Sequence, residues 1–352
     1  MERGVENPRE RKGATMASID DVARAAGVST ATVSRSMSGR GAVSDATREK
    51  VHRAAAELGY VASATAASLA SGRSSNIGIL TPYIDRWFFT EVIRGAQEEL
   101  ASHGYDVTLY NLGSVPAQRS RMLDDFIHRG RVDAFIAIDV PLTSTEITRL
   151  HDIHRPIIGV GGAIAGVRTI SIDDTEVVRI AMRHLLELGH TRIALLGGGD
   201  DDVDVFKVAS TRRKTFESVL RQAGIPLASG MMQFGQFTIP SGYTAAKKLL
   251  NQSNRPTAIL AASDEMAFGA IIAARELGIA IPHDLSIVGI DGHDLGEFFG
   301  LTTIDQNPIQ QGKTAAAILL DEILPHRTET IDINTALPVR LVRRKSTAKP
   351  SS

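Results

Sequence analysis

The chain has 352 residues, of which 43% are hydrophobic, 22% are charged, 5% are aromatic and none is cysteine. This length allows two or three domains of about 100 to 200 residues each, and no apolar run reaches the roughly 18 residues that span a bilayer. The missing cysteines exclude disulfides, zinc fingers and thiolate nucleophiles, and the few aromatic residues argue against a nucleic-acid site built on stacked rings.

Charge is distributed unevenly along the chain. Residues 1–76 carry 11 Lys and Arg against 8 Asp and Glu, a net charge of +3, whereas the remainder carries −4. A mildly basic head therefore precedes a mildly acidic body, which permits a polyanionic partner without requiring one. Residues 1–17 mix acids and bases and lack the apolar stretch of a secretory signal, so we predict a disordered leader, with Met16 as a candidate start, and a cytoplasmic protein.

Three short helices are predicted between residues 18 and 60. Ser18 opens the first, with Asp21 completing a variant of the capping box, and Gly27 ends it. A second helix opens at Ser29. A third opens at Ser44 and ends before Gly59, so residues 18–61 are expected to form a small all-α head.

The first two helices have the pattern of a helix-turn-helix. Small Ala23 allows close approach, Gly27 supplies the turn, and Val28 and Val33 fill the wedge between the helices. The second helix then exposes short side chains and one arginine to a major groove: Ser29, Thr30, Ala31, Thr32, Ser34 and Arg35. Arg35 is the candidate for bidentate pairing with guanine, and the hydroxyls are candidates for phosphate contacts. The alternative is a helical hairpin that packs on its own body.

Residues 62–75 are rich in Ala and Ser and are predicted to form a hinge or linker with one weak helical turn near residues 66–69. From Asn76 onward, short apolar runs alternate with amphipathic helices. We predict strands at residues 77–80, 107–110, 134–138, 157–160, 193–196, 259–262 and 287–290. Such continuous apolar strands are typical of parallel sheets that are covered on both faces.

The fold class predicted is therefore a small all-α head followed by an α/β body of two doubly wound parallel sheets. The body is expected to cover residues 76–345, and a tail residues 346–352. One lobe is expected to combine residues 76–163 with 293–325, and the other residues 164–292 with 326–345.

The stretch from Ser18 to Leu69 resembles the DNA-binding head and hinge of the LacI/GalR family of bacterial repressors, notably at residues 43–51 and 57–60. The body resembles the same family's effector domain, which is similar to periplasmic sugar-binding proteins, as far as residues 337–342. The resemblance implies a homodimer on a palindromic operator in double-stranded DNA. It also implies DNA contacts by Ser18, Tyr60, Ala66 and Leu69, with Leu69 as a wedge in the minor groove.

Two departures from the family pattern concern this hinge. Ala62 stands where the family often has Pro, and Ala67 where it often has Arg, which puts the strength of hinge binding in doubt. The alternative for Leu69 is an ordinary linker residue.

Seven residues are predicted to bind a small-molecule effector between the lobes. Asp85, Phe88 and Phe89 follow a strand end, and a carboxylate beside aromatic rings suits the hydroxyls and C–H faces of a sugar. Four more follow from motif matches to the family: Arg212, Phe237, Ser263 and Asp291. The alternatives are core positions for the two phenylalanines and a surface position for Arg212, while Asp264 is expected to cap the helix that it starts.

No catalytic, metal-binding or cofactor-binding motif is complete. Gly312-Lys313-Thr314 lacks the earlier glycine of a phosphate-binding loop, since residue 307 is Asn. His151 and His154 lack a third metal ligand, and the acidic run at residues 200–204 lacks the spacing of a calcium loop. We therefore predict a ligand-responsive repressor without enzyme activity. The alternatives are the same kind of regulator with a nucleobase effector, a solute-binding protein, and an enzyme on a doubly wound fold.

Overall fold

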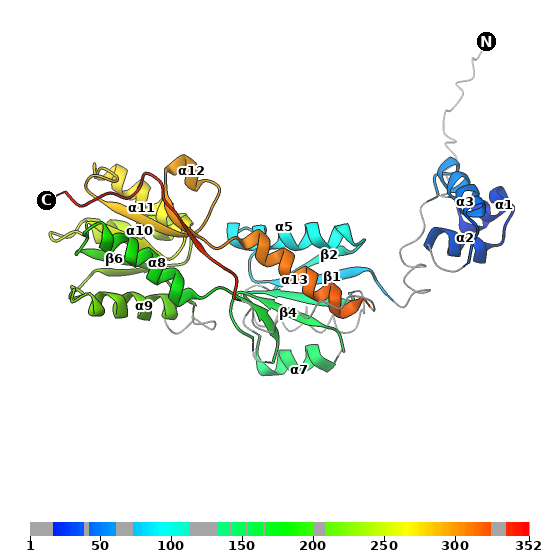
Figure 1. The fold of residues 1–352 in the computed structure, drawn as a ribbon, viewed down its shortest axis with the longest axis horizontal. Coiled ribbons are helices and arrows are strands. Elements are labelled where there is room, and N and C mark those ends of the chain that lie inside the picture. The colour runs from blue at the N-terminus through cyan, green and yellow to red at the C-terminus, as the bar shows by residue number, and fades with distance from the viewer. Residues whose placement is uncertain are drawn as a thin grey trace, which may run out of the picture. The chain divides into compact units, whose positions relative to one another are not determined.

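The computed structural model describes residues 17–38, 42–60, 73–112, 132–140, 142–152, 154–164, 166–199, 208–324 and 336–351. Most of the predicted leader and hinge, residues 1–16 and 61–72, lies outside these ranges. The chain divides into two compact units, Met1–Ser74 and Ser75–Ser352 (Figure 1), which are called the head and the body below. Among the described residues, no helix has both the length and the apolar character needed to cross a membrane.

The head consists of three helices, α1 (Ile19–Ala26), α2 (Thr30–Ser38) and α3 (Asp45–Glu57). Each begins where the hydroxyl pattern predicts. Ser18 caps α1 in a capping box with Asp21, and Ser44 caps α3 by accepting a hydrogen bond from the Thr47 N–H. Gly27 ends α1 in the left-handed conformation, with φ of 63°. Val22, Ala26, Val33 and Val51 have no exposed surface and form the centre of the head's core.

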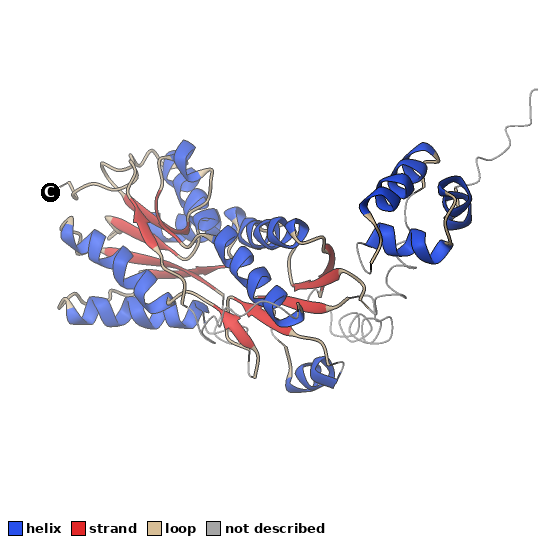
Figure 2. Cartoon of the chain, turned by 45° about the vertical axis from the view of Figure 1, so that its right-hand side comes forward, coloured by secondary structure: helices blue, strands red, loops and turns tan. Residues whose placement is uncertain are grey.

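The body contains two sheets (Figures 1 and 2). The first has the order β2-β1-β3-β4-β5, and all its strands are parallel. These strands are β1 (Asn76–Thr81), β2 (Asp106–Asn111), β3 (Ala134–Ile138), β4 (Ile157–Val160) and β5 (Arg168–Ile170). Helices α5 (Trp87–Ser102) and α13 (Pro308–Ile323) contribute to the core on one face, whereas the other face packs near α7 (Ser144–Asp152).

The second sheet has the order β11-β10-β9-β8-β6-β7, with only β11 antiparallel to its neighbour. Its strands are β6 (Ile193–Gly198), β7 (Met232–Gly235), β8 (Ala258–Ala261), β9 (Ser286–Asp291), β10 (Thr302–Asp305) and β11 (Arg340–Val342). Its helices are α8 (Asp174–Glu187), α9 (Val208–Gln222), α10 (Ile239–Leu250), α11 (Asp264–Glu276) and the short α12 (Gly296–Phe299).

Strand β8 shows why the apolar runs are continuous. Ile259 and Ala261 belong to the core beneath α10 and α11, whereas Ala258 and Leu260 belong to the core beneath α8 and α9. Successive side chains point to opposite faces, so a strand covered on both faces needs apolar residues at every position. All seven predicted strands are present, and the α/β fold class with an all-α head is confirmed.

The predicted lobe boundaries differ from the observed sheets. Strand β5 at residues 168–170 extends the first sheet beyond residue 163. Strand β10 at residues 302–305 belongs to the second sheet, whereas the predicted first lobe includes these residues. Four short strands, β5, β7, β10 and β11, were missed because none is a long apolar run; β10, for example, reads Thr-Thr-Ile-Asp. The predicted tail also differs, because Ser346 is 2% exposed and its hydroxyl donates to the Ile287 carbonyl at 2.6 Å.

Close packing of α5 on α13 explains why residue 312 is a glycine. A Cβ atom on Gly312 would lie 2.0 Å from the Val92 carbonyl oxygen, and one on Gly95 would lie 2.0 Å from that of Ile309. Figure 1 shows the two helices crossing side by side. Gly312 therefore serves helix packing, which agrees with the rejection of Gly312-Lys313-Thr314 as a phosphate-binding loop.

Candidate nucleic-acid interface and effector site

Helix α2 presents the predicted DNA-reading residues on its solvent side. Ser29, Thr30, Ala31, Ser34 and Arg35 are exposed and Thr32 is half-buried, while Val33 points into the core with no exposed surface. The Ser29 hydroxyl accepts a hydrogen bond from the Thr32 N–H at 3.1 Å and thereby begins the helix. The short side chains on the solvent side of α2 leave the helix backbone accessible to a DNA major groove.

The other predicted DNA contacts are placed less uniformly. Ser18 is exposed and caps α1, so its hydroxyl and N–H are engaged with Asp21. Tyr60 is half-buried and packs against the head core. Ala66 and Leu69 lie outside the described residues, so the hinge contacts and the minor-groove wedge stay predictions.

The two phenylalanines at the start of α5 both contact the core of the first sheet. Phe89 is 9% exposed and belongs to the core of the first sheet, as the core alternative held, and Phe88 is half-buried and packs against that core. Their rings meet edge to face with centroids 5.5 Å apart. Asp85 is exposed on the preceding loop.

Two neighbours of these residues, Arg86 and Trp87, connect the two lobes of the body. The Arg86 Nη1 donates to the carbonyls of Gln236 at 2.8 Å and Phe237 at 3.0 Å, in the loop between β7 and α10. The Trp87 ring stacks on the His293 ring with centroids 4.5 Å apart and an interplanar angle of 15°. Sequence patterns did not single out either residue, since a contact between lobes depends on their closure.

Phe237 occupies an unusual backbone position. Its φ is 55°, in the left-handed region, and a Cβ atom on Gly198 would lie 2.0 Å from its ring. The ring therefore lies directly over the carboxyl end of β6, and Gly198 is the residue that allows it. The predicted residue Phe237 and the loop that carries Asp85 are thus joined through Arg86.

Arg212 is buried at 6% exposure, so the surface alternative is wrong. Its Nε and Nη2 both lie 2.7 Å from Oδ1 of Asp174, and its Nη1 donates to the Ala262 carbonyl at 2.6 Å. The guanidinium therefore ties α9 to the start of α8 and to the end of β8. Ser263, the next residue after Ala262, is 5% exposed and caps α11 by accepting from the Met266 N–H.

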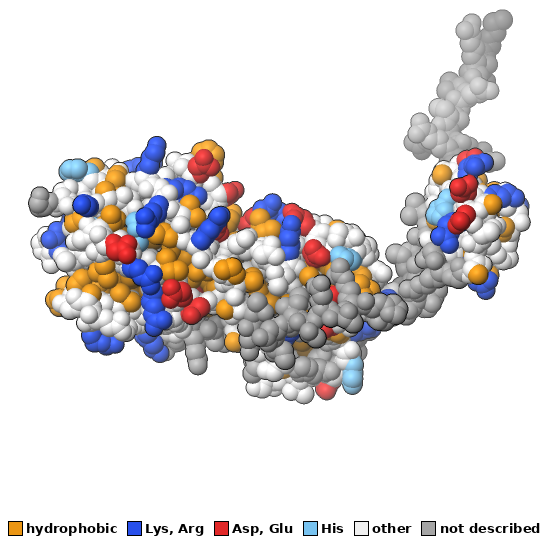
Figure 3. Space-filling view, in the orientation of Figure 1, with side chains coloured by type: hydrophobic (Ala, Val, Ile, Leu, Met, Phe, Trp, Pro, Cys, Tyr) orange, Lys and Arg blue, Asp and Glu red, His pale blue; other side chains and the backbone are white. Residues whose placement is uncertain are grey.

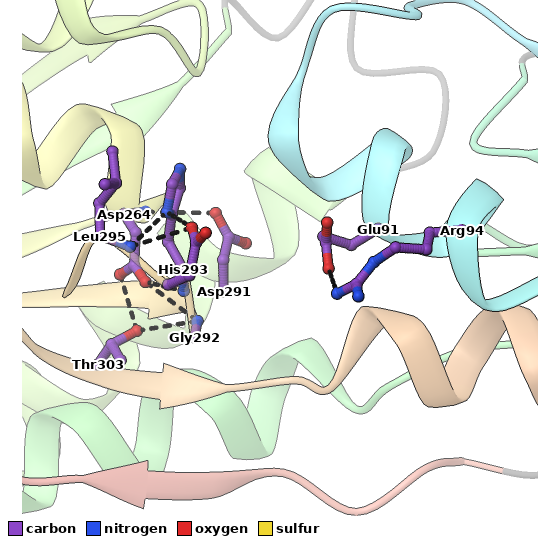
Figure 4. A network of polar contacts seen from close by, with 9 residues as sticks. Glu91, Arg94, Asp264, Asp291, Gly292, His293, Leu295 and Thr303 are labelled. Carbon is purple, nitrogen blue, oxygen red and sulfur yellow. Dashed lines mark hydrogen bonds and ion pairs between the residues drawn. The ribbon is translucent and has the colours of Figure 1, made fainter. Parts of the chain in front are cut away.

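Asp264 does not cap α11, contrary to the expectation, because Ser263 holds that position. Its carboxylate has no exposed surface and accepts three hydrogen bonds: from the Thr303 hydroxyl at 2.7 Å, the His293 N–H at 2.8 Å and the Gly292 N–H at 3.0 Å. Figure 4 shows this network and, apart from it, the ion pair of Glu91 and Arg94 on α5. The carboxylate thus holds the loop after β9 against α11.

Asp291 lies beside Asp264 at the carboxyl end of β9. Its Oδ1 accepts from the Gln306 Nε2 at 2.6 Å, and its Oδ2 accepts from the Asp264 N–H at 3.3 Å. Burial raises the pKa of Asp264 to about 7, and burial together with the adjacent Asp264 charge raises the pKa of Asp291 well above its ordinary value. Its φ of 141° is a further strained feature of the site.

The structure therefore brings Arg212, Ser263 and Asp291 together at the carboxyl ends of β8 and β9, with Phe237 at the end of β6. Ligands of open α/β sheets bind at this end of the strands. The described residues contain no group of three metal-ligating side chains. A separate cavity of about 260 Å³ between α8 and α9 includes Arg179 and Lys214 in its lining and none of the predicted effector residues.

Comparisons with known proteins agree with this architecture. Residues 18–63 match the family described as bacterial regulatory proteins, lacI family, and residues 182–347 match the periplasmic binding protein-like domain. A repressor of Vibrio vulnificus named PurR is 34% identical over 333 residues, which cover 92% of this chain and 98% of the relative. The chain belongs to the LacI family. The Escherichia coli repressor CytR is also similar, at 32% identity over 90% of this chain and 92% of the relative.

Solved LacI-family structures have the same fold. One is the lac repressor dimer bound to operator and the anti-inducer ONPF, which superimposes with a TM-score of 0.81 at 28% identity. The match covers 95% of this chain and 100% of that chain. A regulator of Enterococcus faecium with bound ribose has a TM-score of 0.67 at 31% identity, covering 78% of this chain and 99% of that one. This LacI-family chain is accordingly a DNA-binding transcriptional repressor.

Proposed function

We propose that this LacI-family protein binds a two-fold symmetric operator as a homodimer and releases or holds it in response to a sugar that binds between the lobes of the body. The observation that carries the proposal is the combination of an exposed hydroxyl-rich helix in the head with a buried polar group, Arg212, Ser263 and Asp291, in the body. A solute-binding protein would need only the second feature. The repressors PurR and CytR match the chain across both units.

In the head, α2 enters the major groove and Arg35 reads a guanine through its O6 and N7 acceptors. Thr30 and Ser34 lie on the exposed side of the same helix and are suited to phosphate contacts. One short helix reads only a few base pairs, so a second head is required for operator specificity, and a dimer supplies it with the symmetry of the palindrome. The minor-groove insertion of Leu69 is part of this proposal.

Exposed apolar side chains on the body support a dimer. Phe298 of α12 is 84% exposed, and Leu295 and Ile272 are 41% and 40% exposed. Figure 3 shows hydrophobic side chains at the surface of the body among charged ones. Large exposed aromatic residues are typical of protein interfaces, and the lac repressor neighbour is a dimer on operator.

For the effector, the Asp291 carboxyl group at the end of β9 and the Phe237 ring over the end of β6 favour a sugar, which combines polar hydroxyls with apolar C–H faces. Two structural neighbours were solved with a bound sugar, ribose in the E. faecium regulator and cellobiose in the regulator CelR. CelR has a TM-score of 0.68 at 27% identity, and the match covers 94% of this chain and 99% of that one. The sugar acts by binding one lobe arrangement better than another, which changes the operator affinity. The proposal of operator binding includes a cytoplasmic location for the protein.

The test begins with selection of operator sequences from random duplexes by the full-length protein. Recovery of a palindrome and loss of its recognition in Arg35→Ala are the expected results, and an asymmetric site would refute the dimer.

A thermal-shift screen of sugars, sugar phosphates and nucleobases then identifies the effector class, because a ligand at 100 times its Kd adds about 2.7 kcal/mol of stability. Asp291→Ala is expected to lose this shift, whereas the exposed Asp152→Ala retains it. A shift with nucleobases alone would refute the sugar.

A further inference from the structure

The buried carboxyl groups of Asp264 and Asp291 have too few positive partners for both to be ionised. Asp264 is 0% exposed and Asp291 is 8% exposed. The two residues are neighbours in space, since the Asp264 N–H donates to Asp291 Oδ2 at 3.3 Å. An isolated buried carboxylate is costly, so a group in this position either finds a cation or keeps its proton.

The cations around the pair are already engaged. Arg212 of α9 faces Asp291, but its Nε and Nη2 contact Asp174 of α8 at 2.7 Å, and its Nη1 donates to the Ala262 carbonyl. Arg344, near the C-terminus, donates to the Leu301 carbonyl and acts on Asp264 through its charge. Arg212 is bonded to Asp174 and acts on Asp291 only through its charge, so the ion pairs of the described residues give Asp291 no bonded cation.

The remaining neighbours of Asp291 are neutral. Burial lowers the pKa of His293, which is 7% exposed and follows Asp291 by two positions. Gln306 is buried, and its amide orientation is set because the Gln311 Nε2 donates to its carbonyl groups at 2.9 and 3.3 Å. Gln306 therefore turns its NH₂ toward Asp291 Oδ1, which must accept, and Oδ2 is left as the atom that can bear a proton.

The hydrogen bonds assign the proton to one member of the pair. Asp264 accepts three bonds from N–H and O–H donors, which stabilise its ionised form. Asp291 accepts one short bond from Gln306 and one long bond of 3.3 Å from the Asp264 N–H. The ionised form is thus better stabilised at Asp264.

We propose that Asp291 is protonated at neutral pH in the effector-free protein and offers its O–H to the effector, because burial, together with the neighbouring Asp264 carboxylate, favours the neutral form of Asp291. The protonation of Asp291 concerns the protein alone, whereas the hydrogen bond from Asp291 to the effector rests on the proposed function. The group of the effector that meets Asp291 is then a hydrogen-bond acceptor, such as a hydroxyl, ring or carbonyl oxygen.

The test uses effector-free, full-length protein, so its failure and the failure of the proposed sugar effector are separate outcomes. Infrared difference spectroscopy at pH 7 compares the wild type with Asp291→Asn, which replaces a protonated carboxyl group by a neutral amide of the same shape. The expected result is a protonated-carboxyl band in the wild type that is absent from Asp291→Asn. No such band in the wild type, or the same band in the variant, would overturn the proposal.

A second measurement follows the melting temperatures of both proteins from about pH 5 to about pH 8. A carboxyl group that keeps its proton only when folded makes stability fall as pH rises, because the unfolded chain releases that proton near pH 4. The wild type is therefore expected to lose stability relative to Asp291→Asn as the pH rises, whereas a pH-independent difference contradicts the assignment. Asp152→Asn, at an exposed site, is expected to leave the infrared band unchanged.

Discussion

Replacement of Arg212 by alanine tests whether this residue anchors the effector site through its contacts within the chain. The substitution removes the two contacts with Asp174 at 2.7 Å and the bond to the Ala262 carbonyl at 2.6 Å. Breaking a fully buried ion pair costs about 3 to 5 kcal/mol because a charge is left behind. Here the Asp174 side chain is 18% exposed, so water reaches the carboxylate and the lower end of that range applies, at about 3 kcal/mol.

A loss of about 3 kcal/mol corresponds to a decrease of about 6 to 12 °C in the melting temperature of a unit of this size. Thermal unfolding of the body at pH 7 measures it. Arg183→Ala is the matched control, since Arg183 is 62% exposed and pairs with Glu176 at only 4.0 Å. Such a surface pair is worth about 0 to 1 kcal/mol.

A double variant separates the ion pair from the loss of packing. Adding Asp174→Ala to Arg212→Ala removes the carboxylate left without a partner, so the double variant is expected to be more stable than the sum of the single effects predicts. If Arg212→Ala melts within about 2 °C of the Arg183→Ala control, the guanidinium is not a structural anchor and the reasoning from its contacts fails.

Four further predictions concern other parts of the molecule. Arg35→Ala is expected to weaken operator binding by about 1 to 3 kcal/mol per half-site and to relax one guanine preference in gel-shift assays, and unchanged specificity would contradict the assignment of Arg35. Gly312→Ala forces a Cβ atom to within 2.0 Å of the Val92 carbonyl, so urea unfolding is expected to show a loss of at least about 1 to 3 kcal/mol. Arg86→Ala removes both bonds to the loop at Gln236 and Phe237, and an increased radius of gyration of the effector-free protein in X-ray scattering is the expected sign of lobe opening. Burial lowers the pKa of His190, so the melting temperature is expected to fall as the pH drops below about 6.5, where the unfolded chain takes up a proton, and His190→Gln is expected to reduce that slope.

Sequence patterns were informative wherever the determinants are local. Ser18 and Asp21 begin α1 and Gly27 ends it, and all three lie within ten residues of the sequence. Val33 is buried on the side of α2 opposite its hydroxyls. The seven long apolar strands were predicted for the same reason. Four of the seven residues named for the effector were found by motif match, and three of these four, Arg212, Ser263 and Asp291, converge in the structure, although their role stays a proposal.

What the sequence by itself determined about this protein is the order of its elements, the all-α head with its exposed reading helix, the parallel α/β body and the family. Tertiary structure alone decided that Arg212 is held by Asp174 across 38 positions and that Asp264 supports the loop at His293 across 29. It also decided that β10 pairs between β9 and β11 and that Arg86 reaches the carbonyl of Phe237, 151 positions away. The physical reason is that helix caps and strand alternation depend on neighbours within a few residues, whereas charge compensation, sheet order and lobe closure depend on groups that only the folded chain brings into contact.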